Sequence, residues 1–401
     1  MLARERDLVV RVAGAGHSFS EAVLTDGMLL SLDRMDRVLD INGSAGMVRV
    51  QGGITLRALN ERLQQEGLAL PNLGDIDVQS LAGAVATATH GTGARLPNLS
   101  AGVVSLELAL ADGTTIEVNE RDDADAWRAA RVSIGALGVI TALTLRTVPA
   151  FTLHAIDRPQ PLGEVLDTLE ELTDSNDHFE FYNFPHSGVA LTRSNNRVDV
   201  PAQPRSRSRE WFDDVFVVNH LLSLVCRTGR RLPGTIPRLN RLASRLAGTS
   251  ERIDRSYLIF ASRRDVRFTE MEYALPRENA AAGVRAVREL VERHRFSVPL
   301  PMEVRFVAAD DALLSPAQGR ASAYIAVHMF EGMDYEGYFR AVEEAMVSLG
   351  GRPHWGKRHW LEAGDLSELY PGWTPFASIR SRFDPGGRFT NDYVERVLGP
   401  V

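Results

Sequence analysis

A short strand that runs directly into a glycine-rich turn constrains this chain more than any other stretch. The strand-like run Val9-Val10-Arg11-Val12 is followed by Ala13-Gly14-Ala15-Gly16-His17-Ser18. The small side chains let successive backbone N–H groups converge on a phosphate or diphosphate, as in other nucleotide-binding turns. The turn differs from a GxGxxG fingerprint because His17 follows the second glycine directly. A plain turn after a strand is the alternative interpretation.

Composition and charge limit the classes of function. The chain has 401 residues, 44% of them hydrophobic, which suits two domains better than one core. A net charge of −7 argues against nucleic-acid binding, because no cationic surplus exists to release counterions from phosphates. The single cysteine, Cys226, excludes an intramolecular disulfide and fits a reducing compartment. We therefore predict a cytoplasmic protein with small-molecule partners.

Two stretches beyond residue 200 are candidates for a membrane span and for an exposed loop. No apolar run reaches the ~18 residues that a membrane span requires. The best candidate, 215–226, is interrupted by Asn219 and His220, and we expect a buried or groove-lining helix there. Residues 201–209 are rich in proline, serine and arginine, which predicts an exposed loop.

A second run of small residues lies at 80–89. Such a run suits a tightly packed core helix. It also lets the backbone approach a flat ring or a diphosphate closely, with Ser80, Thr87 and Thr89 offering hydroxyl groups. Residue composition alone leaves both interpretations open.

Several motifs occur in one order along the chain: AGAGHS at 13–18, LPNLGDIDVQSLAGAVATATHGTG at 70–93, SIGALGVITALTL at 133–145, PHWGK at 353–357 and FDPGGRFTNDY at 383–393. Together they resemble the aldonolactone oxidoreductases, with the alditol oxidases as relatives, in the vanillyl-alcohol oxidase flavoprotein superfamily. The resemblance covers nearly the whole chain. It implies an α+β fold with a two-lobed FAD-binding domain and a substrate or cap domain, whose antiparallel sheet is backed by helices.

The resemblance also implies domain boundaries. We expect an FAD-binding domain at 1–150, a cap domain at 151–349 and a segment at 350–401 that returns to the flavin. Family members carry a further strand-helix-strand unit before the turn, so we expect an N-terminally shortened FAD-binding domain. Alternating or apolar runs predict strands at 28–32, 38–41, 47–51, 103–110, 114–118, 139–145, 179–184, 256–260, 303–308 and 324–328. Helical spacing or composition predicts helices at 56–66, 121–131, 278–294 and 335–349.

FAD is the cofactor that the resemblance implies, bound by Ala13, Gly14, Ala15, Gly16, His17, Ser18, Gly74, Asp75, Ser80, Gly83, Ala84, Thr87, His90, Gly138 and Ile140. Many family members join the histidine that matches His17 covalently to the flavin. A histidine that only hydrogen-bonds the turn is the alternative. We expect no catalytic metal, because the sequence contains no HExxH motif, no pair of CxxC motifs and no carboxylate cluster.

Oxidising a secondary alcohol requires a proton acceptor and a hydride acceptor, and the flavin N5 supplies the second. Glu303 and Arg305 lie two apart on a predicted strand and so share a face; an exposed ion pair is the alternative. The resemblance implies that Glu303 binds substrate hydroxyls and that Arg305 lies near N5. It also makes His328 the candidate proton acceptor, with a core histidine as the alternative. Lys357 matches the family's active-site lysine, which polarises the substrate oxygen.

The resemblance implies FAD-dependent oxidation of an L-gulono- or D-arabinono-1,4-lactone at a CH–OH group. The product is an ascorbate-like enediol, and O2 or another acceptor reoxidises the flavin. An alditol oxidase and a flavin-free, non-catalytic sugar-binding protein are the alternatives. Alditol oxidases carry Ala-Ser and Thr where this chain has Gly74-Asp75 and Phe330, and these differences favour a compact lactone ring.

Gly74 generates a first prediction. Family dehydrogenases tend to carry a bulkier residue there, which obstructs oxygen, so we expect the reduced flavin of this protein to react with O2. After anaerobic reduction by a lactone, admitting air should restore the oxidised flavin spectrum. A spectrum that stays bleached in air contradicts this expectation.

Overall fold

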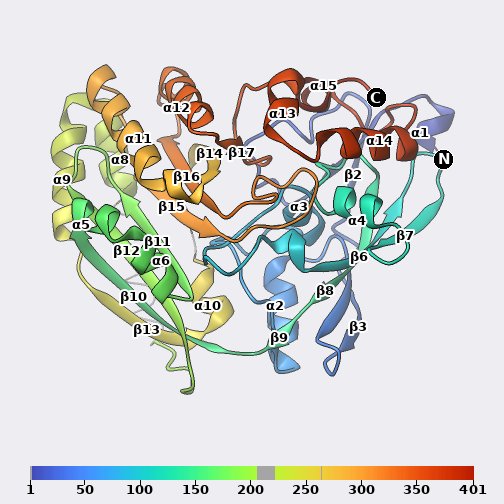
Figure 1. Cartoon of the computed structure of the whole chain (residues 1–401), viewed down its shortest axis with the longest axis horizontal. Helices are drawn as coiled ribbons and strands as arrows, with labels where there is room; N and C mark the ends of the chain where they lie inside the picture. Colours follow the sequence, from blue (N-terminus) through green and yellow to red (C-terminus); the bar gives the residue numbers. More distant parts are fainter. Residues whose placement is uncertain (1, 206–221, 263) are drawn as a thin grey trace.

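Two antiparallel sheets of different size organise the chain, and they lie on opposite sides of the molecule in Figure 1. The computed structural model describes residues 2–205, 222–262 and 264–401. The smaller sheet contains, in spatial order, β3 (Val38–Asn42), β4 (Met47–Gln51), β8 (Val139–Arg146), β6 (Val103–Ala109) and β7 (Thr115–Asn119). The larger sheet contains β13 (Ser250–Arg255), β10 (Thr152–Pro161), β12 (Val189–Val198), β11 (His178–Asn183), β15 (Met302–Val307), β16 (Ser322–Phe330), β14 (Phe268–Pro276) and β17 (Arg352–Pro353).

The smaller sheet packs its apolar residues against the helices of the first 150 residues. Alternation along β4 buries Val48 and Val50, as the period of a half-buried strand requires. A tight turn at Asp112-Gly113 joins β6 to β7, with Gly113 at φ 88°. The helices of this part are α1 (Leu2–Glu5), α2 (Leu56–Gln65), α3 (Leu81–Ala86) and α4 (Ala124–Arg131).

Local capping fixes the ends of α2, which coincides with the predicted helix at 56–66. The Thr55 hydroxyl accepts a hydrogen bond from the Ala58 N–H at 3.2 Å, and Gly67 follows the helix at φ 69°. The small-residue run forms α3, whose Leu81, Ala84 and Val85 are buried. The core-helix interpretation of that run is therefore confirmed for 81–86.

Two pairs of short strands complete the first part. The strand before the glycine-rich turn is β1 (Val10–Ala13), which pairs in parallel with β2 (Met28–Ser31). The other pair is β5 (Leu68–Ala69) with β9 (Val148–Pro149), antiparallel. The turn at 14–18 therefore begins where β1 ends, as expected.

The larger sheet has one apolar face and one polar face near its middle. Along β15, Met302, Val304 and Phe306 belong to a core that helices cover, whereas Glu303 and Arg305 project from the other face. The helices on the apolar face are α5 (Leu162–Asp167), α6 (Leu169–Ser175), α11 (Ala280–His294) and α12 (Glu336–Ser348). This arrangement confirms the predicted antiparallel sheet backed by helices.

Most of the last fifty residues pack onto the first part of the chain, whereas Trp360 packs against α12. They form α13 (Ala363–Leu369), α14 (Trp373–Phe383) and α15 (Asp392–Leu398), drawn in red near the N-terminus in Figure 1. The buried Arg11 guanidinium donates to the backbone oxygens of Ala22 and Phe389, both at 2.7 Å. The Val10 N–H donates to the Arg388 oxygen, also at 2.7 Å. The two ends of the chain thus stabilise the same core.

One predicted strand is wrong. Ser256–Phe260 forms a short helix, α10, in which Ser256, Ile259 and Phe260 are buried. A five-residue apolar run does not distinguish a strand from a helix by its periodicity. Here β13 ends at Arg255 and the helix follows directly. Ile259 and Phe260 lie three and four residues after Ser256, so all three share one buried helix face, and Phe260 contacts the rings of Phe151 and His178.

The two stretches beyond residue 200 lie partly outside the described residues. The predicted helix at 215–226 is described only from 222, where α8 (Leu222–Arg231) contains the buried Cys226. It is followed by α9 (Ile236–Leu246). The predicted loop at 201–209 is described only as far as 205, where it forms no helix or strand.

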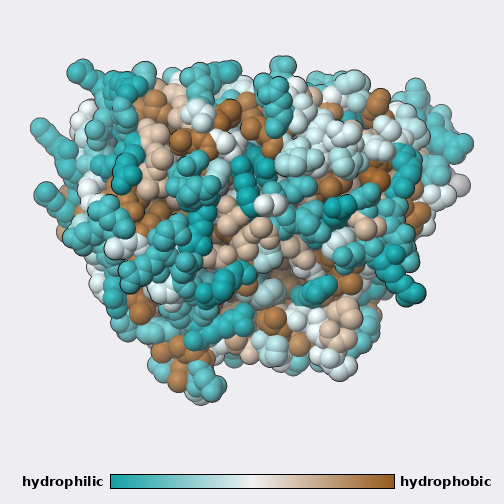
Figure 2. Space-filling view, in the orientation of Figure 1, coloured by the Kyte–Doolittle hydropathy of each residue, from teal (hydrophilic) through white to brown (hydrophobic). Residues whose placement is uncertain are grey.

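The surface of the described residues is mixed. Figure 2 shows hydrophilic residues over most of one face, with hydrophobic residues in small separate groups. None of the helices in the described ranges combines the length and the apolar character needed to cross a bilayer.

The packing of the C-terminal segment generates a pH prediction. Burial, together with the nearby Arg396, lowers the pKa of His359 to about 3. A histidine in the unfolded chain titrates near ~6.5, so the unfolded state binds a proton that the folded state rejects as the pH falls. Stability is therefore lost between those two values. The parent protein should therefore lose free energy of unfolding when the pH falls from 7 to 5. In His359→Phe this loss should be smaller by about 2 kcal/mol, as measured by urea titrations at the two pH values.

The matched control is His294→Phe, because His294 is exposed on α11. In this variant the free energy of unfolding should change between pH 7 and pH 5 by the same amount as in the parent protein. An equal pH dependence for parent and His359→Phe contradicts the prediction.

Candidate active site

A cleft of about 680 Å³ lies where the first part of the chain, the polar face of the larger sheet and the segment after β17 meet. Eleven of the residues predicted for cofactor or catalysis line it, which the sequence alone could not place together. They are Gly16, His17, Ser18, Gly74, Asp75, Thr87, His90, Glu303, Arg305, His328 and Lys357.

The turn at 14–18 lines the cleft with its residues 16–18 and offers unpaired amide groups. Within the described ranges, residues 14–18 donate no backbone hydrogen bond, whereas the Phe19 N–H donates to the Gly356 oxygen at 2.7 Å. All five residues are exposed. The turn therefore presents N–H groups to an external acceptor, as an anion-binding turn does.

The turn packs closely against the start of α3. A Cβ atom on Gly14 would lie 2.7 Å from the Ser80 hydroxyl oxygen, and the Gly14 Cα lies 3.9 Å from the position of a Gly83 Cβ. Only a residue without a side chain leaves this contact undisturbed. Gly14 therefore packs against Ser80 and Gly83. These three residues lie beside the cleft and do not line it.

The other predicted cofactor residues lie behind the walls. Ala84 and Ile140 are buried in the core of the first part, and Gly138, at φ 148°, approaches the Ala109 carbonyl. Ala13 ends β1, and Ala15 is exposed in the turn. These five residues do not line the cleft.

The Glu-x-Arg pair lies at the centre of a buried charge network. The Arg305 guanidinium pairs with Glu303 and Asp75, and its Nε lies 3.1 Å from Glu180. Arg264 also pairs with Asp75. Burial alone would raise the pKa of Glu303, but Arg305 and Arg264 outweigh it and lower that pKa. The exposed ion pair that was the alternative for Glu303 and Arg305 is thereby excluded.

The neighbouring carboxyl group behaves differently. Burial dominates at Glu180 and raises its pKa, although Arg305 opposes the shift. The Tyr182 hydroxyl lies 3.0 Å from Glu303 and 3.3 Å from Glu180, so it joins the two groups. This cluster of carboxylates, absent from the sequence as a motif, is created by pairing β11 with β15.

Lys357 and His328 meet at Glu270 of β14. The Lys357 ammonium nitrogen lies 2.6 Å from Glu270 Oε2, and His328 Nε2 lies 3.6 Å from Oε1. Burial would raise the pKa of Glu270, but Lys357 and His328 outweigh it and hold it at about 2. Glu270 is therefore ionised at neutral pH.

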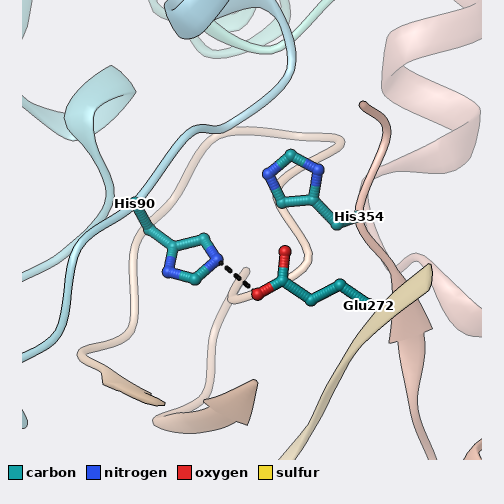
Figure 3. Close-up of side chains that lie close together, drawn as sticks. All are labelled: His90, Glu272 and His354. Atoms are coloured by element: carbon teal, nitrogen blue, oxygen red, sulfur yellow. Dashed lines mark ion pairs between the residues drawn. The ribbon is translucent and has the colours of Figure 1, made fainter. Parts of the chain in front are cut away.

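Two histidines and a second glutamate form a further cluster, drawn in Figure 3. His90 Nε2 lies 3.2 Å from Glu272, and the His354 ring stands beside the same carboxylate. His354 Nδ1 accepts the Gly356 N–H at 3.0 Å. Burial, only partly offset by Glu272, lowers the pKa of His354 to about 3, so its ring is neutral at pH 7.

His17 lies on the exposed turn at the edge of the cleft. Partial burial and the nearby Lys357 ammonium both lower its pKa. The imidazole is therefore neutral at pH 7, which leaves one ring nitrogen with a free electron pair.

Sequence reasoning missed Glu180, Tyr182, Arg264, Glu270 and Glu272. A signal existed for two of them, because Glu270 and Glu272 alternate on one strand face, as Glu303 and Arg305 do. Their partners come from other strands and loops, so their function could not be seen before the strands were paired.

Comparison with known proteins places this site in context. Residues 143–397 match the family model described as D-arabinono-1,4-lactone oxidase, and residues 1–119 match that of an FAD binding domain. An L-gulono-1,4-lactone dehydrogenase of Mycobacterium tuberculosis is 50% identical over 398 residues, which are 99% of this chain and 92% of that protein. The L-gulonolactone oxidase of Mus musculus is 36% identical over 99% of this chain and 91% of its own.

More distant relatives share the scaffold. An alditol oxidase of Streptomyces is 31% identical over 98% of this chain and 92% of its own. The crystal structure of a cholesterol oxidase from B. sterolicum superposes with a TM-score of 0.82 at 16% identity, covering 99% of this chain and 91% of that one. That likeness confirms the predicted fold: an FAD-binding domain followed by a sheet-containing domain.

FAD is the cofactor of this chain, and the turn offers a structural test of how it is bound. Gly14→Ala should weaken FAD binding by about tenfold, because the new Cβ would displace the hydroxyl group of Ser80, a predicted FAD-binding residue beside the turn. The FAD-to-protein absorbance ratio of the purified protein measures the effect. Gly188→Ala, at a site with open space, is the control. Equal flavin content in both variants contradicts the prediction.

Proposed function

Because the chain belongs to the D-arabinono-1,4-lactone oxidase family, we propose that it uses FAD to oxidise an aldono-1,4-lactone at a CH–OH group. One observation carries the proposal. His328, Lys357, Glu303 and Arg305, from separate strands and a loop, line one cleft with the glycine-rich turn. An alcohol oxidation needs these components together: a proton acceptor, a cation for the reacting oxygen and groups that hold hydroxyls.

His328 is the proposed proton acceptor. The Pro301 carbonyl oxygen lies 2.8 Å from its Nδ1, so Nδ1 carries the proton of the neutral ring and Nε2 has a free electron pair. His328 also lines the cleft, which favours this role over that of a core histidine. FAD, when bound, supplies the hydride acceptor.

Lys357 is the proposed electrostatic catalyst. Its ammonium lies on the cleft wall, 5.3 Å from the centre of the Phe19 ring, and Glu270 fixes its position. A compact cation there stabilises the negative charge that develops as the substrate hydroxyl loses its proton.

Glu303 and Arg305 are the proposed substrate-binding pair. Glu303 is ionised and accepts hydrogen bonds, so it suits sugar hydroxyls. Arg305 donates to Glu303 and Asp75 and thereby orients both carboxylates. Phe330 lines the same cleft and is largely buried, which favours a compact ring over an open-chain polyol.

Further features belong to the same proposal. The chain would divide into a cofactor part at 1–150, a cap at 151–349 and a returning segment at 350–401. His17, neutral at the cleft edge, is suited to a covalent bond with the flavin. O2 or another acceptor would reoxidise the flavin, the product would be an ascorbate-like enediol, and the single cysteine favours the cytoplasm.

Anaerobic titration of the yellow protein tests the function. L-Gulono- or D-arabinono-1,4-lactone should bleach the flavin band, and xylitol should do so at least tenfold more slowly. Lys357→Ala should bind FAD normally and be reduced about 100-fold more slowly or worse, because the developing alkoxide loses its cation. Faster reduction by xylitol would favour the alditol oxidase alternative. No reduction by any lactone or polyol would overturn the proposal.

A further inference from the structure

The cation beside the candidate proton acceptor is chemically unique in this protein. Of 45 lysine and arginine residues in the 401-residue sequence, all but Lys357 are arginine. An ammonium is a compact point charge with three rotatable donors, whereas a guanidinium is a broad planar fork. A point charge on a flexible stem needs an anchor if it is to hold one position over the cleft.

Glu270 is that anchor, and it contacts the Lys357 segment twice. Its carboxylate Oε2 lies 2.6 Å from the lysine nitrogen, and its backbone oxygen accepts the Arg358 N–H at 3.1 Å. Two residues along β14, the Glu272 oxygen accepts the His354 N–H at 3.0 Å. The loop that carries Lys357 is thus bound to β14 at both of its ends.

The same glutamate faces the candidate proton acceptor. Glu270 and His328 are direct partners in the register of β14 and β16, and His328 Nε2 lies 3.6 Å from Oε1. Each carboxylate oxygen therefore serves a different group, Oε2 the lysine and Oε1 the histidine. Both Glu270 and His328 are buried, so solvent screens these interactions weakly.

We propose that Glu270 is a positioning residue that fixes the Lys357 ammonium through one carboxylate oxygen and stabilises the protonated form of the His328 imidazole through the other. The inference rests on the proposed function. When the substrate O–H bond breaks, its electron pair stays on the oxygen and the proton forms an N–H bond at His328 Nε2. The Glu270 carboxylate, 3.6 Å from that nitrogen, then stabilises the positive charge of the new imidazolium.

The electrostatic surroundings do not supply a substitute for Glu270. The charged and titratable groups that interact with it are His328, Lys357, Glu272, Glu303, Arg264 and His354. Glu272 is committed to His90, and Glu303 to Arg305. Among the residues that the structure describes, Glu270 is the carboxylate that pairs with Lys357.

Glu270→Gln in the flavin-loaded protein tests the inference. The amide keeps the shape but loses the charge, so kcat for the lactone should fall about 10- to 100-fold while KM changes less than about threefold. Glu270→Asp, which keeps the charge on a shorter stem, should recover part of kcat. Glu289→Gln, in an exposed ion pair on α11, is the control for the loss of one charge and should match the parent.

The unique lysine gives a second readout that does not depend on turnover. An amine-directed reagent such as trinitrobenzenesulfonate can modify only Lys357 and the N-terminal amine, which peptide mass spectrometry separates. Without the carboxylate anchor, modification of Lys357 should be about tenfold faster in Glu270→Gln than in the parent and should slow again in Glu270→Asp.

The possible outcomes are distinguishable. Parental kcat and parental Lys357 reactivity in Glu270→Gln would overturn the positioning role while leaving lactone oxidation intact. Equal losses in Glu270→Gln and Glu270→Asp, with unchanged Lys357 reactivity, would also overturn it and indicate a purely structural residue. If the parent is not reduced by any lactone, the proposed function fails, and the reactivity comparison still decides whether Glu270 holds Lys357.

Discussion

Pairing of buried opposite charges across segment boundaries is the constraint on which the rest of this structure depends. Asp75, from the first part of the chain, meets Arg305 of the larger sheet. His90, also from the first part, meets Glu272 of β14. Lys357, from the C-terminal segment, meets Glu270 of the same strand. An isolated ion in such a place is costly, so each pair favours one relative placement of the segments that supply it.

The C-terminal segment joins the two walls of the cleft. Its backbone binds the first turn through Phe19 and Gly356, and it binds β14 through His354 and Glu272. The Arg11 guanidinium then ties the first strand to the Phe389 carbonyl. One segment therefore contacts both walls of the cleft, and its backbone hydrogen bonds set where the loop that carries Lys357 lies.

The predictions that held share a physical basis in local geometry. Alternation put Glu303 and Arg305 on one strand face, and helical spacing predicted α2. The prediction that failed, a strand at Ser256–Phe260, concerned a run too short for its period to identify. The conformation of this run depends on the end of β13 at Arg255 and on the aromatic rings that Phe260 contacts.

By itself the sequence determined the parts: a turn that can bind a phosphate, two sheets, and a glutamate, two cationic side chains and a histidine suited to alcohol oxidation. The turn and the strands follow from short-range spacing, which a linear chain records directly, and the resemblance to the aldonolactone oxidoreductases selected the four side chains. Only the tertiary structure decided the partners, above all Glu270 for Lys357 and His328, and Glu180 and Tyr182 for Glu303. Those contacts depend on strand register and on which segments meet at the cleft, and neither is written in the spacing of neighbouring residues.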